Sequence, residues 1–202
     1  AAKERWFHLE LKLNLSGLVR YLTAADKNRG AKAREIRAQS GSDYNPGTDH
    51  WRQMRLAIYN DRRTVRDGSL VEAAVAAAHV RKQASYQVVA DRWPEIAQRW
   101  APAAFQRPTG ADLTIGGLDI AVRPLFSEIW PDGSIEDVTV WMNVEEPSDL
   151  AVRGALRLLT RADPSPASIA TFVDVRRGLA WSSSGEGSDS VDDWLDGVGA
   201  RF

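Results

Sequence analysis

The spacing of apolar residues changes near residue 108, and this change most constrains the fold. Residues 1–107 mostly carry apolar side chains at the three- and four-residue intervals of amphipathic helices. After residue 108, several segments instead alternate apolar and polar residues, as in strands with one buried face, and a helix is expected over about residues 149–161. The sequence therefore predicts a single compact α+β domain over residues 1–181. Its helical, basic half packs on a mainly antiparallel β-sheet formed mostly by the second half.

Two β-hairpins are predicted in the second half of the chain. The first spans residues 113–122 and turns at Gly116-Gly117, and the second spans residues 125–144 and turns at Asp132-Gly133. Residues 6–15 also alternate, which predicts one strand in the first half.

Two helices of the first half carry clear start signals. Residues 46–48 form a turn and an N-cap before a helix that is expected to run to Arg66. Ser69 and Glu72 form a capping box that opens onto an alanine-rich helix. Because alanines let another element approach closely, this second helix is predicted to lie at the centre of the fold.

The net charge of −1 conceals an uneven distribution. Residues 1–107 carry a balance of +8, whereas residues 108–202 carry −9, and no lysine follows Lys82. The two halves are therefore expected either to face each other or to meet separate partners of opposite charge.

Composition excludes several classes of protein. The absence of cysteine rules out disulfides, thiolate zinc sites, iron–sulfur clusters and a cysteine nucleophile. No apolar run approaches the roughly 18 residues of a membrane span, and the first residues lack the apolar core of a signal peptide. We therefore expect a cytoplasmic protein without a membrane partner. The histidines His8, His50 and His79 lack the spacing of a zinc helix, and no phosphate-binding glycine loop occurs.

A helix reaching Arg66 would carry cations and one aromatic residue along one face. At 100° per residue, six positions fall within an arc of about 100°. They are Arg52, Arg55, Tyr59, Arg62, Arg63 and Arg66. Guanidinium groups bind phosphates and tyrosine stacks on bases, so the stripe predicts a surface for nucleic acid or an acidic protein partner. The alternatives are a solvated face and a face docked on the acidic half.

Acidic residues near the second hairpin are the only catalytic prospect. A turn at Asp132-Gly133 would place Glu128 and Glu136 opposite each other. The alternative catalytic set is Asp119, Glu128, Asp132 and Glu136, with Glu128 and Asp132 as ligands of Mg²⁺ or Mn²⁺. The simpler interpretation is a plain turn with acids facing solvent, which predicts no catalytic residue, metal or cofactor.

The second half also contains a strand, hairpin and helix order with two distinctive stretches. They read Leu-Asp-Ile-Ala-Val-Arg-Pro at 118–124 and Pro-Asp-Gly-Ser-Ile-Glu-Asp-Val-Thr-Val-Trp-Met-Asn at 131–143. With these stretches, residues 113–161 resemble the β-meander core of the PD-(D/E)XK nuclease superfamily. In that family one strand supplies an aspartate and the next supplies an acid and a lysine, which together hold a divalent metal.

The motif positions of this chain depart from that pattern. Leu125 stands where the resemblance places the aspartate, and residues 139–141 read Thr-Val-Trp in place of the acid and lysine. The resemblance therefore implies a nuclease-like scaffold whose active site is degenerate. Glu10-Leu11-Lys12 has the acid-spacer-lysine form, but no aspartate-bearing hairpin precedes it.

Residues 182–202 are rich in serine, glycine and acids, and are predicted to form a flexible tail. Trp194 and Leu195 within it suggest docking on a partner or folding back on a basic surface of the same chain. Taken together, the sequence favours a non-enzymatic binding or interaction protein. The alternative is a metal-dependent nuclease or phosphoesterase that uses the acidic hairpin. The oligomeric state is left open.

Overall fold

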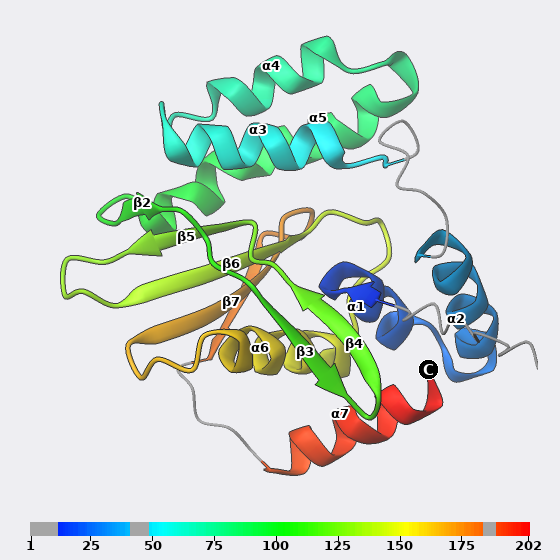
Figure 1. The fold of residues 1–202 in the computed structure, drawn as a ribbon. Helices are drawn as coiled ribbons and strands as arrows, with labels where there is room; N and C mark the ends of the chain where they lie inside the picture. The colour runs from blue at the N-terminus through cyan, green and yellow to red at the C-terminus, as the bar shows by residue number, and fades with distance from the viewer. Residues whose placement is uncertain (1–11, 41–48, 184–188) are drawn as a thin grey trace, which may run out of the picture.

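A computed structural model describes residues 12–40, 49–183 and 189–202 (Figure 1). The helices are α1 (Leu15–Thr23), α2 (Asp26–Ser40), α3 (Arg52–Arg63), α4 (Ser69–Ala77), α5 (Val80–Ala97), the 3-10 helix η1 (Gln98–Trp100), α6 (Asp149–Ala162) and α7 (Asp189–Arg201). The strands are β1 (Lys12–Asn14), β2 (Ala104–Gln106), β3 (Ala111–Ile115), β4 (Leu118–Val122), β5 (Phe126–Ile129), β6 (Ile135–Trp141), β7 (Ser168–Asp174) and β8 (Leu179–Ser183). Helices dominate the first half and strands the second, so the α+β prediction is confirmed.

The strands form two sheets instead of the one expected. A five-stranded sheet has the order β2-β5-β6-β7-β8, and a three-stranded sheet has the order β1-β4-β3. The β6–β7 and β1–β4 pairs are parallel, and the other pairs are antiparallel. Both predicted hairpins form, with left-handed glycines in their turns at Gly116, Gly117 and Gly133. The two hairpins therefore belong to different sheets, β3 and β4 to the three-stranded sheet and β5 and β6 to the five-stranded sheet.

The five-stranded sheet carries helices on both faces (Figure 1). Alternate side chains of β7 show the division: Val173 packs with α3 and α5 on one face, whereas Phe172 packs with α6 on the other. On the first face, Trp93 and Trp100 meet Phe126 of β5 edge to face. Helix α6 connects the parallel strands β6 and β7, a connection that parallel strands require.

The alanine-rich helix α4 forms, but without the predicted capping box, because its N-cap is Gly68 and no side chain caps it. It lies at the outer edge of the molecule (Figure 1). Val71 is its only buried residue. The helix ends at Ala77 because Ala78 adopts an extended backbone and the His79 imidazole caps the next helix, accepting from the Arg81 N–H. The prediction of a central position was therefore wrong. Alanine permits close approach but does not supply the large apolar surface that drives a helix into a core.

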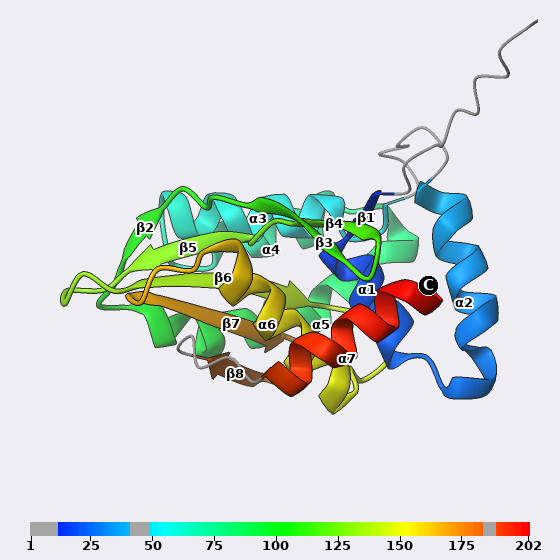
Figure 2. The same ribbon diagram turned by 60° about the horizontal axis from the view of Figure 1, so that its bottom comes forward.

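The predicted flexible tail was wrong for residues 189–202, because α7 packs against the domain. Its side chains Leu195 and Val198, and Phe202 directly after it, are buried in the same cluster as residues of α1 and α6. Figure 2 shows α7 beside these two helices. The Asp192 carboxylate accepts hydrogen bonds from the Arg157 guanidinium of α6. Residues 189–202 therefore fold back on basic groups of the same chain, which was one of the two alternatives predicted for this segment. The preceding residues 184–188 lie outside the described part.

Three other predictions concern segments that the structure describes only in part or not at all. The predicted strand over residues 6–15 is a strand at Lys12–Asn14, and residues 6–11 lie outside the described part, as do Glu10 and Leu11 of the acid-spacer-lysine triplet. Asn14 then caps α1, its side chain accepting from the Gly17 N–H at 2.7 Å. Residues 46–48, the predicted turn and N-cap, also lie outside the described part. Within the described residues, no helix is both long and apolar enough to cross a membrane.

Candidate functional site

Helix α3 stops at Arg63, one turn earlier than expected, and Asp61 fixes that stop. Its buried carboxylate accepts from the Gly68 N–H at 2.9 Å and from the Trp93 indole N–H at 3.5 Å. The chain between these points turns sharply, and Arg66 takes a left-handed backbone with φ of 61°. Arg66 is therefore not part of the helical stripe, and its side chain is directed inward.

Arg62 and Arg66 bind inside the protein to one carboxylate, Glu128 of β5. The Arg62 Nε donates to Glu128 at 2.8 Å, and the Arg66 Nη2 donates to the other oxygen at 3.1 Å. Arg62 and Glu128 are 1% and 0% exposed. Both guanidinium groups also donate to the Trp100 carbonyl oxygen, at 3.3 Å from Arg62 and 2.9 Å from Arg66. Arg62 is fully buried, and Arg66, which keeps a quarter of its side chain exposed, is held toward Glu128. For these two residues the contacts support the docked face.

Arg55 and Tyr59 are partly engaged. The Arg55 guanidinium donates to the Asp49 carboxylate at the start of the helix. Tyr59 is half-buried and meets Phe105 of β2 edge to face, with ring centroids 5.4 Å apart. These two side chains therefore keep only part of their surface for a partner.

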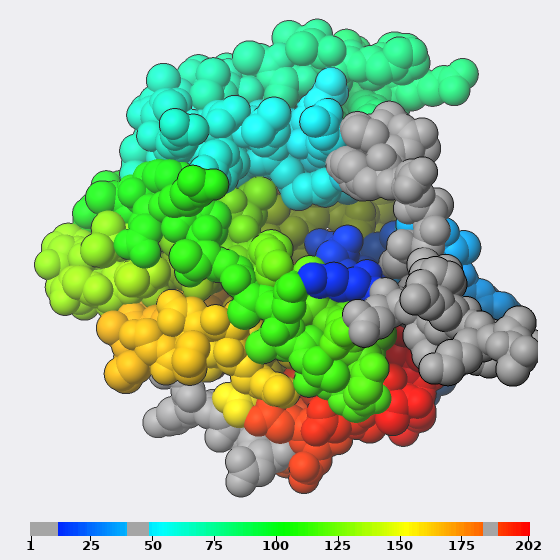
Figure 3. Space-filling view, in the orientation of Figure 1, coloured from blue at the N-terminus to red at the C-terminus, as the bar shows by residue number. Residues whose placement is uncertain are grey.

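Arg52 and Arg63 are the stripe residues that stay exposed. On a helical wheel they lie within about 20° of each other, with Tyr59 beside them, and about 16 Å apart along the axis. Among the described residues, no carboxylate forms an ion pair with either arginine. Figure 3 shows α3 at the surface, above a hollow that separates it from the β1-β4-β3 sheet.

Helix α2 adds further exposed cations. Lys27 and Arg34 lie on its outward side, opposite the buried Ala33 and Ile36, and no described carboxylate pairs with them. Arg37 lies over the Phe202 ring, 5.3 Å from its centroid. No carboxylate in the described part forms an ion pair with it.

The second hairpin places Glu128 directly opposite Glu136, as predicted. Both side chains point toward the α3–α5 face, and each is neutralised there by its own partners. Glu136 is 1% exposed and accepts from Arg99 at 3.2 Å, from the Thr171 hydroxyl at 2.6 Å and from the Trp130 indole at 2.9 Å. The charge of each carboxylate is thus compensated by arginine from the first half of the chain.

The other two predicted acids lie elsewhere. Asp132 is in the hairpin turn, where the Ser134 hydroxyl donates to it at 2.7 Å and lowers its pKa. Asp119 belongs to β4 in the other sheet and accepts from Thr114 at 2.6 Å. In the described part of the chain, no three or more His, Asp or Glu side chains are grouped to hold a metal. The four acids therefore lie apart in the fold, with Asp119 in the three-stranded sheet, Asp132 in an exposed turn, and Glu128 and Glu136 buried in the five-stranded sheet.

Asp137, the residue after Glu136, is also a buried acid. It is 3% exposed on the α6 face of the sheet, and the Ser127 hydroxyl donates to it. Burial raises its pKa and the nearby Asp163 adds to that effect, while the Ser127 hydrogen bond opposes it. Because Asp137 follows Glu136 in the same strand, the two side chains point to opposite faces of the sheet. Both are buried because helices cover both faces.

No protein-family model and no curated protein matches the sequence significantly. Among solved structures, one titled "Crystal structure of SSO0001" matches 95% of this chain and 76% of its own chain, with a TM-score of 0.45 and 10% sequence identity. A likeness of this degree assigns neither a family nor a function.

Proposed function

We propose that this chain is a non-enzymatic binding protein for nucleic acid, with its contact surface on α3 and α2. The observation that carries the proposal is the pair Arg52 and Arg63, exposed on one side of α3 with Tyr59 between them. Guanidinium groups contact phosphates, and a half-exposed tyrosine ring can stack on a base. The cations of α2 would extend the same contact.

Nucleic acid fits these residues better than an acidic protein does. An acidic protein would use the arginines equally well, but Tyr59 gains most from a flat aromatic partner such as a base. The catalytic alternative has less support, because Glu128 and Glu136 are each bound to arginine. A nuclease-like scaffold without the family's metal-binding motif is compatible with this proposal and remains part of it.

The test is fluorescence anisotropy with labelled single- and double-stranded DNA and RNA at low and moderate salt. We expect binding that weakens as salt rises, because contacts to phosphates release counterions. The double variant Arg52→Glu and Arg63→Glu should weaken binding by about tenfold or more at low salt. Tyr59→Leu should weaken binding with a smaller change in the salt dependence, since it removes stacking and no charge.

Arg153→Glu together with Arg92→Glu is the matched control, because both residues are exposed on other helices and lack a described acidic partner. It makes the same change in net charge. If the folded protein binds none of the four nucleic acids at low salt, the proposal fails. Equal loss in both double variants would mean that only overall charge matters. Binding to polyglutamate but to no nucleic acid would assign the surface to an acidic protein instead.

A further inference from the structure

The exposed side of α3 has cations at its two ends and less polar side chains between them. On a helical wheel, four residues fall within an arc of about 60° and follow one another along the axis in the order Arg52, Leu56, Tyr59 and Arg63. Leu56 is 54% exposed and lies about 6 Å along the axis from Arg52. The one acid of α3, Asp61, is buried on the opposite side of the helix. The exposed side therefore presents a short apolar surface flanked by positive charge.

Tyr59 is held in place at one side of this surface. Its ring meets the Phe105 ring of β2 edge to face, with centroids 5.4 Å apart. This contact restricts the rotation of the Tyr59 side chain before any ligand binds, so less conformational entropy is lost on binding. A tyrosine ring that is half-buried and already fixed suits the stacking of a flat partner.

Helix α3 does not project from its surroundings. Figure 2 shows α3 along the same side of the molecule as β2, β3 and β4, and Figure 3 shows these segments on one broad face. The major groove of a duplex is about 8.5 Å deep, so only a helix that projects can reach its bases. A duplex would therefore meet this face mainly with its phosphates, and Leu56 would lie against them.

We infer that α3 binds single-stranded nucleic acid and discriminates against a duplex, an inference that rests on the proposed function. In a single strand the faces of the bases are accessible, so they can cover Leu56 and stack on Tyr59. Arg52 and Arg63 then contact phosphates on either side of those bases. In a duplex, neighbouring base pairs cover the base faces, which leaves Leu56 and Tyr59 without an apolar partner.

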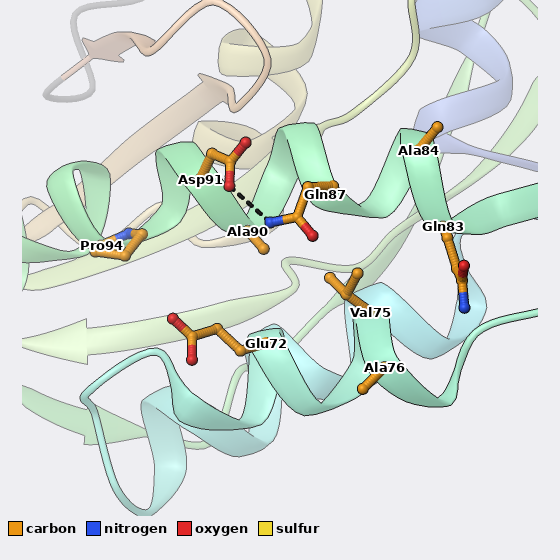
Figure 4. A pocket seen from close by; sticks show the side chains of 9 residues that line it. All are labelled: Glu72, Val75, Ala76, Gln83, Ala84, Gln87, Ala90, Asp91 and Pro94. Atoms are coloured by element: carbon orange, nitrogen blue, oxygen red, sulfur yellow. Dashed lines mark hydrogen bonds between the residues drawn. The ribbon is translucent and has the colours of Figure 1, made fainter.

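The groove between α4 and α5 does not extend this surface. It has a volume of about 700 Å³ and is lined by Glu72 and Asp91, and none of its described lining residues is a cation (Figure 4). These acids repel phosphates, so the strand is confined to α3 and does not continue into the groove. The groove also offers a control position, Ala84, which is exposed and belongs to its lining.

Fluorescence anisotropy with three labelled DNA probes tests the inference. They are a single strand, the duplex of the same sequence, and a strand of equal length whose nucleotides lack bases. We expect the single strand to bind about tenfold more tightly than the duplex at the same salt concentration. The abasic strand keeps the phosphates and should bind about tenfold more weakly than the intact strand, because no base covers Leu56 and Tyr59. Single-stranded and duplex RNA are compared in the same way.

Leu56→Arg separates base contacts from phosphate contacts. It should tighten binding to the duplex and to the abasic strand, because it adds a third cation between Arg52 and Arg63. It should also narrow the preference for the intact single strand by about threefold or more, since apolar surface is lost. Ala84→Arg adds the same charge in the α4–α5 groove and should leave that preference unchanged. Arginine is a good helix former and both positions are exposed, so both variants should fold, which circular dichroism checks.

The outcomes separate this inference from the proposed function. Equal or tighter binding to the duplex, for both DNA and RNA, overturns the inference and leaves the proposed function standing. An abasic strand that binds as tightly as the intact strand has the same consequence. Equal effects of the two arginine variants on the preference overturn the base contact at Leu56. If the folded protein binds none of the probes at low salt, the proposed function itself fails, and the inference fails with it.

Discussion

At the residue scale, Arg62 and Arg63 are neighbours in sequence with opposite surroundings. Arg62 is 1% exposed and bound to Glu128, whereas Arg63 is exposed on the outer side of α3. The helical wheel places them 100° apart, which is enough to send one side chain inward and the other to solvent. Burial of a bonded Arg–Glu pair contributes little net stability compared with apolar packing, but removing one partner leaves a buried charge.

We expect Arg62→Met to lower the free energy of unfolding by about 3–5 kcal/mol, because Glu128 keeps only its weaker contact to Arg66. Adding Glu128→Gln should recover part of that loss, since the amide carries no charge. Urea unfolding of the single and double variants measures both effects. Arg63→Met serves as control and should change stability very little. A loss from Arg62→Met no larger than that from the control would contradict the structural role.

Asp137 should make stability depend on pH in the direction opposite to most acids. Its folded pKa is raised, so the native state binds the proton more tightly and stability falls as pH rises from about 3.9 through the folded pKa. Asp137→Asn should therefore stabilise the protein by about 0.5–2 kcal/mol at pH 7. The gain should vanish near pH 3, where the acid is protonated in both states.

Thermal and urea unfolding at the two pH values provide the measurement. Asp132→Asn is the control, because the Ser134 hydrogen bond lowers the pKa of Asp132. This variant should not stabilise the protein at neutral pH. An Asp137→Asn variant that is less stable than the parent at pH 7, or equally altered at both pH values, would refute the assignment.

At the element scale, α7 shows how two glycines make a helix part of the core. A Cβ atom on Gly199 would lie 2.0 Å from the Ile115 carbonyl oxygen, and one on Gly116 would lie 1.9 Å from the Asp196 carbonyl oxygen. The Asp196 carboxylate also accepts from the Gly116 N–H at 3.0 Å. The end of the β3–β4 hairpin and the last turn of α7 therefore touch backbone to backbone, which buries Leu195 and Val198.

Gly199→Ala should destabilise the protein by about 1–3 kcal/mol, because the contacted atoms are backbone and cannot turn aside. Gly197→Ala, two residues earlier in α7, has no comparable contact and should be neutral or stabilising by up to about 1 kcal/mol. Urea unfolding gives both values, and hydrogen exchange should show faster exchange across α7 in Gly199→Ala. Equal effects of the two substitutions would mean that α7 does not depend on this contact.

At the scale of the whole molecule, ion pairs connect the basic half to the acidic half. Arg62, Arg66 and Arg99 from the first half bind Glu128 and Glu136 in the second. Two apolar clusters lie on opposite faces of the five-stranded sheet and share its strands β6 and β7. Because the strands belong to both clusters, loss of either cluster removes support from the other.

The prediction of one compact domain can be tested on this point. Leu158→Ala in one cluster and Ile58→Ala in the other should each cost about 2–5 kcal/mol. Each should shift a single transition, with tryptophan fluorescence and far-ultraviolet circular dichroism coinciding. Leu56→Ala, at a residue that is 54% exposed, is the control and should have a small effect. Two separated transitions would mean that the clusters unfold independently.

The sequence alone determined the features that depend on neighbouring residues. The turn at Asp132-Gly133 sets the register that pairs Glu128 with Glu136, because a turn acts within a few residues. The start of α4 at Ser69 is also local, although its N-cap is Gly68 and not Ser69. The tertiary structure decided which surfaces meet. It turned Arg62 and Arg66 toward Glu128, left α4 outside and folded α7 back, since these outcomes depend on contacts between residues far apart in the chain, which no local pattern encodes.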